Sequence, residues 1–151
     1  MPGLPLPFAV EGMAAVEHMG SIYVWGGMME DSTRNRAALL RLDPRTRAWS
    51  TLPAMPTPTV HAGAAGVAGR MYVTGDSLAA GVAEGSLQCY DMAAGRWDKS
   101  SASMAEARDA LGVAALHREV WAVGGWSHPK VMMSRPSPYY SHARHEPCHE
   151  V

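Results

Sequence analysis

Short apolar runs, separated by glycine, proline and polar residues, follow one another along most of the chain. Small residues alternate with larger apolar ones at 12–16, 63–67 and 112–116, and each of these runs is followed by a turn and a second, more hydrophobic run. Short runs that are rich in Val, Tyr and Trp and end in glycine are typical of β-strands. The pattern therefore predicts an all-β protein built from many short strands.

The second runs are related hexamers that repeat at a fixed period. They read IYVWGG, MYVTGD and VWAVGG and begin at residues 22, 71 and 120, so that successive hexamers start 49 residues apart. A Leu-Pro, Met-Pro or Met-Ala pair begins 16 residues before each hexamer, at residues 6, 55 and 104. Two markers that keep one register indicate a tandem repeat of about fifty residues.

A third marker lies between the hexamers. The segments LDPRTRAW and YDMAAGRW place Asp43 and Asp91 six residues before Trp49 and Trp97, respectively. Each full unit therefore has room for four short strands, which is the content of one propeller blade. The repeats that these markers define are 6–54, 55–103 and a truncated third one, 104–125.

The markers resemble the Kelch repeat, which has a diglycine, a Tyr-Asp pair and a tryptophan six residues further on. The sequence departs from that pattern at Asp76, in place of a glycine, and at Leu42, in place of the tyrosine. The arginine that precedes the first strand of a Kelch repeat occurs only as Arg108, with Val10 and Thr59 at the matching positions. The residues that carry the resemblance are Gly26, Gly27, Asp43, Trp49, Gly75, Tyr90, Asp91, Trp97, Gly124 and Gly125.

The resemblance implies an incomplete Kelch β-propeller of about two and a half four-stranded blades. Paired glycines permit positive φ and a close backbone approach where the second strand ends, and the aromatic surfaces of Tyr90 and Trp97 are expected to pack between blades. Because the repeat stops after Gly125, we expect the third blade to lack its two outer strands and 126–151 to be a disordered tail. Uncapped blade edges also offer a route to self-association.

Composition and charge narrow the function classes. The chain has 15 Gly, 11 Pro and only 18% charged residues, and 13 Lys and Arg nearly balance 14 Asp and Glu. The basic residues are scattered, so we expect neither nucleic acid nor a membrane as a partner. Cys89 and Cys148 have no CxxC partner, and the first residues lack the apolar core of a secretion signal, which favours a cytoplasmic location.

No residue pattern predicts a catalytic site, and we expect no cofactor. The sequence contains no GxSxG, HExxH, P-loop or dinucleotide-binding motif. The tail carries several residues of metal-binding type, but their spacing matches no closed zinc site, so no metal is predicted. These residues are His128, His142, His145, Cys148 and His149.

The resemblance places partner binding on the loops between the second and third strands of a blade and on the connections between blades. Variable loops on a regular scaffold often carry recognition, and the two such loops, 28–36 and 76–85, differ completely in chemistry. Arg108 occupies the position from which Kelch arginines face the central channel, and an ion pair with Glu106 or Asp109 is its alternative role. The candidate partner-binding residues are Glu30, Asp31, Arg34, Asn35, Arg36, Asp76, Glu84, Glu106 and Arg108.

A protein-interaction module is the function that the resemblance implies, with another protein of unknown identity as the partner. Many Kelch proteins carry BTB and BACK domains ahead of the propeller and recruit substrates to a cullin-type ubiquitin ligase. A substrate-recognition fragment of such an adaptor, without enzymatic activity, is therefore the leading hypothesis. Two alternatives stay open: a propeller enzyme with copper or iron chemistry, which requires ligands from several blades, and a truncated isoform without function.

Overall fold

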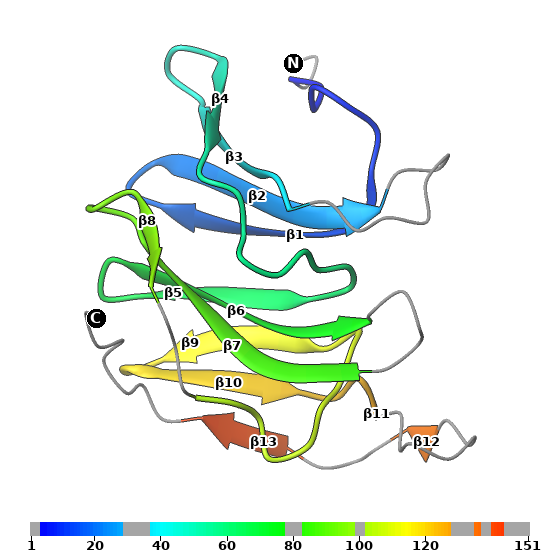
Figure 1. The fold of residues 1–151 in the computed structure, drawn as a ribbon. Coiled ribbons are helices and arrows are strands. Elements are labelled where there is room, and N and C mark those ends of the chain that lie inside the picture. The colour runs from blue at the N-terminus through cyan, green and yellow to red at the C-terminus, as the bar shows by residue number, and fades with distance from the viewer. Residues whose placement is uncertain are drawn as a thin grey trace.

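The structure is a computed structural model that describes residues 4–28, 37–77, 83–98, 102–127, 135–136 and 140–143. Its three larger antiparallel sheets, here called blades 1, 2 and 3, are stacked one below the other in Figure 1. Within the described residues no helix is long and apolar enough to cross a lipid bilayer. The sequence-based prediction of an all-β fold with repeated sheets is confirmed.

Each blade is a meander in which neighbouring strands in the chain are hydrogen-bonded neighbours. Blade 1 consists of β1 (Glu11–His18), β2 (Ser21–Met28), β3 (Leu39–Asp43) and β4 (Ala48–Leu52). Blade 2 consists of β5 (Gly63–Val67), β6 (Arg70–Ser77), β7 (Ala83–Asp91) and β8 (Arg96–Asp98). Blade 3 consists of β9 (Gly112–Leu116), β10 (Glu119–Val123) and β13 (Tyr140–Ala143), and β11 (Trp126–Ser127) pairs with β12 (Arg135–Pro136).

Two sequence-based expectations about these boundaries are wrong. The loop expected at 76–85 is shorter, because the β6–β7 ladder resumes after a register shift between Thr74 and Asp76 and pairs Asp76 with Glu84. The third blade was expected to have two strands, but Tyr140–Ala143 pairs with the free edge of β10. Strand pairing needs only backbone N–H and C=O groups, so a segment without repeat markers can supply it. The other residues of the predicted tail, apart from those of β11 and β12, lie outside the described ones.

A chain of backbone hydrogen bonds runs from blade to blade at one repeat position. The His61 N–H donates to the Gly12 carbonyl at 2.9 Å, and the Ala110 N–H donates to the His61 carbonyl at 3.0 Å. Gly12, His61 and Ala110 lie 49 residues apart in sequence and all have positive φ, at 64°, 58° and 48°. The same left-handed backbone therefore lies at the start of the first strand of blade 1 and two residues before the first strands of blades 2 and 3, whichever residue occupies it.

The first glycine of the diglycine marker allows a close contact between successive blades. Gly26 has a φ of +69°, and a Cβ there would lie 2.7 Å from the Thr59 carbonyl oxygen, on the segment that leads into blade 2. The matching Gly75 has a φ of +77°, and a Cβ there would lie 2.8 Å from the Arg108 carbonyl oxygen, on the segment that leads into blade 3. These distances leave no room for a side chain, which confirms the predicted close backbone approach at both glycines.

The hydrophobic core lies between the blades. Tyr23 and Trp25 of β2 pack with Met71 and Val73 of β6 in one cluster between blades 1 and 2. A second cluster joins Tyr72 and other residues of blade 2 to blade 3. Because β2 and β6 are buried on both faces over most of their length, they read as continuous hydrophobic runs rather than as alternating ones.

The two marker tryptophans each join the outer strand of a blade to the segment that precedes the first strand of the same blade. Trp49 Nε1 donates to the Pro5 carbonyl at 3.0 Å, and Trp97 Nε1 donates to the Pro53 carbonyl at 2.9 Å, with a separation of 44 residues in both cases. The Trp97 ring also packs against Tyr90, with ring centroids 5.0 Å apart. Each marker tryptophan thus forms a specific hydrogen bond in addition to the packing that the sequence predicted.

The diglycine contact predicts unequal effects of one substitution at two matching positions. Gly124 has a φ of +72° but no atom within 4 Å of an added Cβ, so Gly124→Ala adds only left-handed backbone strain, about 1 kcal/mol. Gly26→Ala adds the same strain and forces Thr59 away, so we expect a loss of about 3 kcal/mol. Urea unfolding followed by tryptophan fluorescence measures both losses, and equal losses would contradict an inter-blade role for Gly26.

Candidate functional site

The structure describes four of the nine predicted partner-binding residues, Asp76, Glu84, Glu106 and Arg108. The other five lie outside the described residues, and these are Glu30, Asp31, Arg34, Asn35 and Arg36. Asp76 and Glu84 are paired in the β6–β7 ladder and not in a loop. A partner-binding role for these residues stays a prediction.

Glu106 and Arg108 lie together at one end of blade 3. The Arg108 side chain is buried, and its Nη2 donates to Glu106 Oε2 at 2.5 Å. Arg108 Nη1 donates to the Gly124 carbonyl at 3.3 Å, and Ser127 Oγ donates to Glu106 Oε1. The ion pair with Glu106 that the sequence offered as an alternative role for Arg108 is therefore present.

The aspartates of the Asp–Trp marker close the turn between the third and fourth strands. Asp43 Oδ1 accepts from the Arg45 N–H at 2.8 Å, and Asp91 Oδ1 accepts from the Ala93 and Ala94 N–H groups at 2.9 and 2.8 Å. The pKa of each carboxyl lies below its ordinary value of 3.8, mainly because these backbone donors stabilise the ionised form. The aspartate of the Asp–Trp marker is thus explained by its hydrogen bonds to the backbone of this turn.

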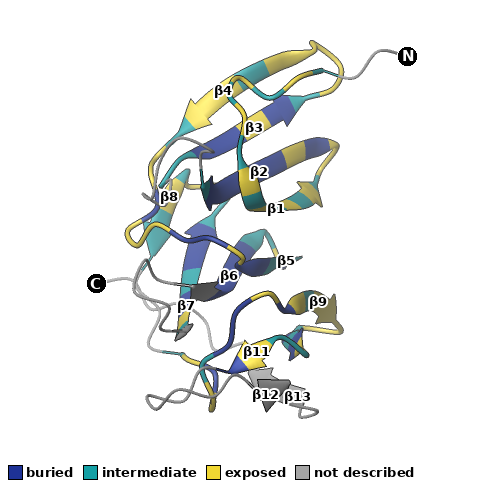
Figure 2. Cartoon of the chain, turned by 90° about the vertical axis from the view of Figure 1, so that its right-hand side faces the viewer, coloured by how far each residue is buried: buried dark blue, intermediate teal, exposed yellow. Residues whose placement is uncertain are grey.

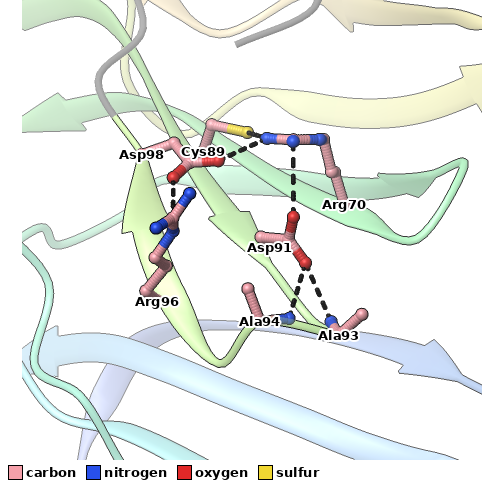
Figure 3. A network of polar contacts seen from close by, with 7 residues as sticks. All are labelled: Arg70, Cys89, Asp91, Ala93, Ala94, Arg96 and Asp98. Atoms are coloured by element: carbon pink, nitrogen blue, oxygen red, sulfur yellow. Dashed lines mark hydrogen bonds and ion pairs between the residues drawn. The ribbon is translucent and has the colours of Figure 1, made fainter. Parts of the chain in front are cut away.

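Blade 2 contains a closed network of charges, drawn in Figure 3. Arg70 Nη1 lies 2.5 Å from Asp98 Oδ2 and 3.7 Å from Cys89 Sγ, and Arg70 Nη2 lies 3.3 Å from Asp91 Oδ2. Arg96 Nε lies 3.2 Å from the other oxygen of Asp98. The hydrogen bonds with Cys89 and then Asp98 raise the pKa of Arg70 above its ordinary value. This arginine is fully compensated inside its own blade.

A cleft of about 600 Å³ lies between blades 1 and 2, at the end of the sheets opposite to Arg108. That end carries the β1–β2 and β5–β6 turns, on the left of Figure 1. Its described lining, here called the interblade cleft, contains a cation and apolar groups but no carboxylate. The lining residues are His18, Met19, Ser21, Tyr23, Arg41, Gly69, Met92 and Ala93.

The side of blade 3 that points away from blade 2 is exposed, although it repeats a side that blade 2 buries. Leu116 is 53% exposed, whereas Val67, which precedes it by 49 residues, is 8% exposed. Val123 is 41% exposed, whereas the matching Thr74 is 3% exposed. Figure 2 shows exposed residues of β9 in yellow. We call this surface, with Leu116 and Val123, the forward end face.

Blade 1 has a complementary exposed surface on its opposite side. Met13 is 43% exposed and Ile22 is 36% exposed, whereas the matching residues of blade 2, Ala62 and Met71, are buried against blade 1. We call this surface, with Met13 and Ile22, the backward end face. Within the structure, the forward side of one blade packs on the backward side of the next. The two end faces are therefore surfaces of the two types that pack against each other between blades.

The described residues include no group of three His, Cys, Asp or Glu side chains placed to hold a metal ion. Cys89 is fully buried and contacts Arg70, and His18 and His61 lie at turns or strand ends. The histidine and cysteine side chains of the tail lie outside the described part of the chain, so the absence of a metal and of enzymatic activity stays a prediction.

Sequence reasoning missed the interblade cleft. No motif spans it, because its residues come from turns and strand edges of two blades. The signal that could have found it is a comparison of matching positions: Ser21 and Arg41 of blade 1 match Arg70 and Cys89 of blade 2, so the arginine has moved from the second strand to the third.

The blades, their stacking and their repeated contacts define an incomplete β-propeller. No family model matches the chain. Among curated proteins it is similar to Kelch-like protein 40 of Xenopus laevis, with 23% identity over 123 residues that make up 82% of this chain and 20% of that protein. A solved structure titled "Structure of YjhT" is similar with a TM-score of 0.66 and 19% identity, over 84% of this chain and 37% of that one. The chain thus spans about a fifth of the curated relative.

The charge network of blade 2 predicts a stability difference between two charge-removing substitutions. Asp98 is nearly buried and accepts from the partly buried Arg70, whereas Arg96 is mostly exposed. Asp98→Asn leaves Arg70 with one carboxylate fewer, and we expect a loss of about 1–2 kcal/mol. Arg96→Gln, the matched control, is expected to change stability by about 0.5 kcal/mol or less. Urea unfolding measures the stability loss of each variant. If Arg96→Gln lost as much stability as Asp98→Asn, the assigned role of the Asp98–Arg70 pair would be contradicted.

The turn aspartates predict an acid-dependent loss of stability. The pKa of Asp91 is lower in the folded state than its ordinary value of 3.8, first because of the Ala94 N–H. Its ionised form therefore stabilises the fold above that value, and the contribution is lost as the pH falls through the lowered pKa. Asp91→Asn cannot ionise, so its stability deficit should be constant from about pH 7 to about pH 5 and shrink in more acid solution. A deficit that is independent of pH down to about pH 2 would contradict this prediction.

Proposed function

We propose that the chain is a protein-interaction module whose docking surfaces are the ends and edges of its propeller blades. The observation that carries the proposal is the pair of end faces, because Leu116, Val123, Met13 and Ile22 expose apolar area at positions that other blades bury. Each end face therefore exposes apolar side chains where the stack of blades elsewhere covers them, as a surface that receives a protein partner would. The similarity to Kelch-like protein 40 supports the same class of function.

The protein surface that fits an end face best is another blade. The forward end face of one copy offers the kind of surface that packs on the backward end face of a second copy, in the arrangement that already joins blades 1, 2 and 3. Such a contact is head-to-tail, and two copies with the three blades described above supply six blades, within the roughly four to eight of closed propellers. Self-association of the isolated chain is therefore the first expected interaction.

A finer proposal follows from the Kelch resemblance of the repeat markers. The chain corresponds to part of a substrate-recognition propeller related to adaptors of cullin-type ubiquitin ligases, and it acts by binding and not by catalysis. Its support is the repeat pattern together with the similarity to Kelch-like protein 40. The partner is a protein, and a cytoplasmic location is part of the proposal, supported by the same resemblance and by two cysteines that lie far apart in sequence without a CxxC partner.

Light scattering after size exclusion tests the proposal on the purified chain. We expect a particle of about twice the chain mass of 16.2 kDa. Met13→Glu or Leu116→Glu places a charge in the apolar interface and should return the particle to the monomer mass at the same concentration. The matched control is Met19→Glu, because Met19 is 89% exposed but lies outside both end faces.

A mixture of the two interface variants distinguishes head-to-tail from symmetric association. Mixed Met13→Glu and Leu116→Glu chains retain one unmodified pair of end faces, so the mixture should regain a two-chain particle while each variant alone stays monomeric. A symmetric contact through the forward end faces alone would leave Met13→Glu unaffected. A wild-type chain that stays monomeric with folded β-structure would remove the end faces as the carrier of the proposed function.

A further inference from the structure

The arginine of the interblade cleft lacks the carboxylates that its counterpart in blade 2 has. Arg41 Nε donates to Ser21 Oγ at 3.0 Å, which fixes the direction of the guanidinium group. Within the described part of the chain, no ion pair joins Arg41 to a carboxylate. The terminal nitrogens of Arg41 thus present a planar pair of donors, the geometry that binds a carboxylate with two parallel hydrogen bonds.

Comparison of matching positions shows why this cation is uncompensated. Cys89 is paired across the sheet with Asp98 in blade 2, and Arg41 is paired across the sheet with Ser50 in blade 1. Blade 1 therefore has a serine where blade 2 has the carboxylate that binds Arg70. The Ser50 hydroxyl donates to the Arg41 carbonyl at 3.4 Å and adds no charge.

Two carboxylates in the strands and turns around the cleft have other partners. Glu17 Oε1 accepts from the Gly20 N–H at 2.8 Å, in the β1–β2 turn. Asp91 accepts from two backbone N–H groups and lies 3.3 Å from Arg70. Neither residue lines the interblade cleft, so Arg41 stands among neutral groups there, with His18 as the other titratable basic residue.

The rest of the interblade cleft is suited to an apolar side chain. Met19, at a φ of +48° in the β1–β2 turn, is 89% exposed, and Met92 lies on the other wall. Met92 also packs partly against the core cluster between the blades. Flexible methionine side chains adapt to apolar partners of different shape and recur on peptide-binding surfaces.

We propose that the interblade cleft binds a segment of a partner protein in which an Asp or Glu side chain pairs with Arg41 and a neighbouring apolar side chain lies between Met19 and Met92. The partner's carboxylate takes the place that Asp98 fills in blade 2. The proposal rests on the proposed protein-binding function but uses a surface separate from both end faces.

A peptide array tests the proposal with the full chain. The array pairs Asp, Glu, Asn or Gln with Leu, Met, Phe or Tyr in an otherwise Gly-Ser sequence and is probed with labelled protein. We expect each acidic peptide to bind about tenfold or more tightly than its amide counterpart, because only the carboxylate forms the charge-assisted pair. Equal binding of acidic and amide peptides, or no binding of either, would overturn the proposal.

Three variants locate the binding. Arg41→Gln should remove the preference for acidic peptides, whereas Arg45→Gln, in the same blade but outside the lining, should keep it. Ser50→Asp places a carboxylate across the sheet from Arg41, as Asp98 stands across from Cys89, and should also lower binding of the acidic peptides about tenfold. Arg41→Gln binding the acidic peptides as tightly as the wild-type chain would overturn the proposal.

Methionine methyl resonances report the site directly. On addition of an acidic peptide we expect the Met19 and Met92 signals to shift and the Met13 signal to stay in place, because Met13 belongs to the backward end face. The opposite pattern would place the peptide on the end face and contradict the cleft. Arg41→Gln and Ser50→Asp should keep the wild-type particle mass, and Met13→Glu should keep the preference for acidic peptides, so failure of one proposal is distinguishable from failure of the other.

Discussion

Close backbone packing between neighbouring blades is the constraint on which the rest of the structure depends. The hydrogen bonds from His61 to Gly12 and from Ala110 to His61 repeat one contact at one position of each unit. Gly26 and Gly75 let the next inter-blade segment approach to a distance that excludes any Cβ. Because these contacts use backbone atoms and tolerate few side chains, they fix how far apart successive sheets lie. The clusters around Tyr23 and Tyr72 fill the space that remains.

This spacing explains why the side chains of matching positions can diverge without a change of fold. Ser21 and Arg41 in blade 1 and Arg70 and Cys89 in blade 2 occupy the same two places, yet both pairs join the second strand to the third by a side-chain contact. Because the backbone contacts set the sheet geometry, the arginine can lie on the second strand in one blade and on the third strand in another. One blade compensates its arginine internally, and the other leaves it facing a cleft.

The sequence predicted the features that depend on repeated residue types, and it missed those that depend on backbone pairing or on differences between repeats. The diglycines and the Asp–Trp marker predicted the strands of blades 1 and 2. The pairing of Tyr140–Ala143 with β10 was not predictable from markers, because any extended segment can complete a free strand edge. The left-handed conformation at His61 and Ala110 gives no residue signal either, since only the first unit has glycine there.

The same logic indicates where binding can arise in a repeat protein. At positions where all three blades bury an apolar side chain, as at Val24, Val73 and Ala122, that side chain belongs to the packed interior and is not accessible to a partner. A surface becomes available where a side chain is exposed at a position that another blade buries, as at Leu116, or where one unit omits a group that another contains, as Ser50 does opposite Arg41. Arg41 is an exposed residue that lines the interblade cleft, and none of the described lining residues is a carboxylate, so a carboxylate that enters the cleft can form charge-assisted hydrogen bonds with its guanidinium group.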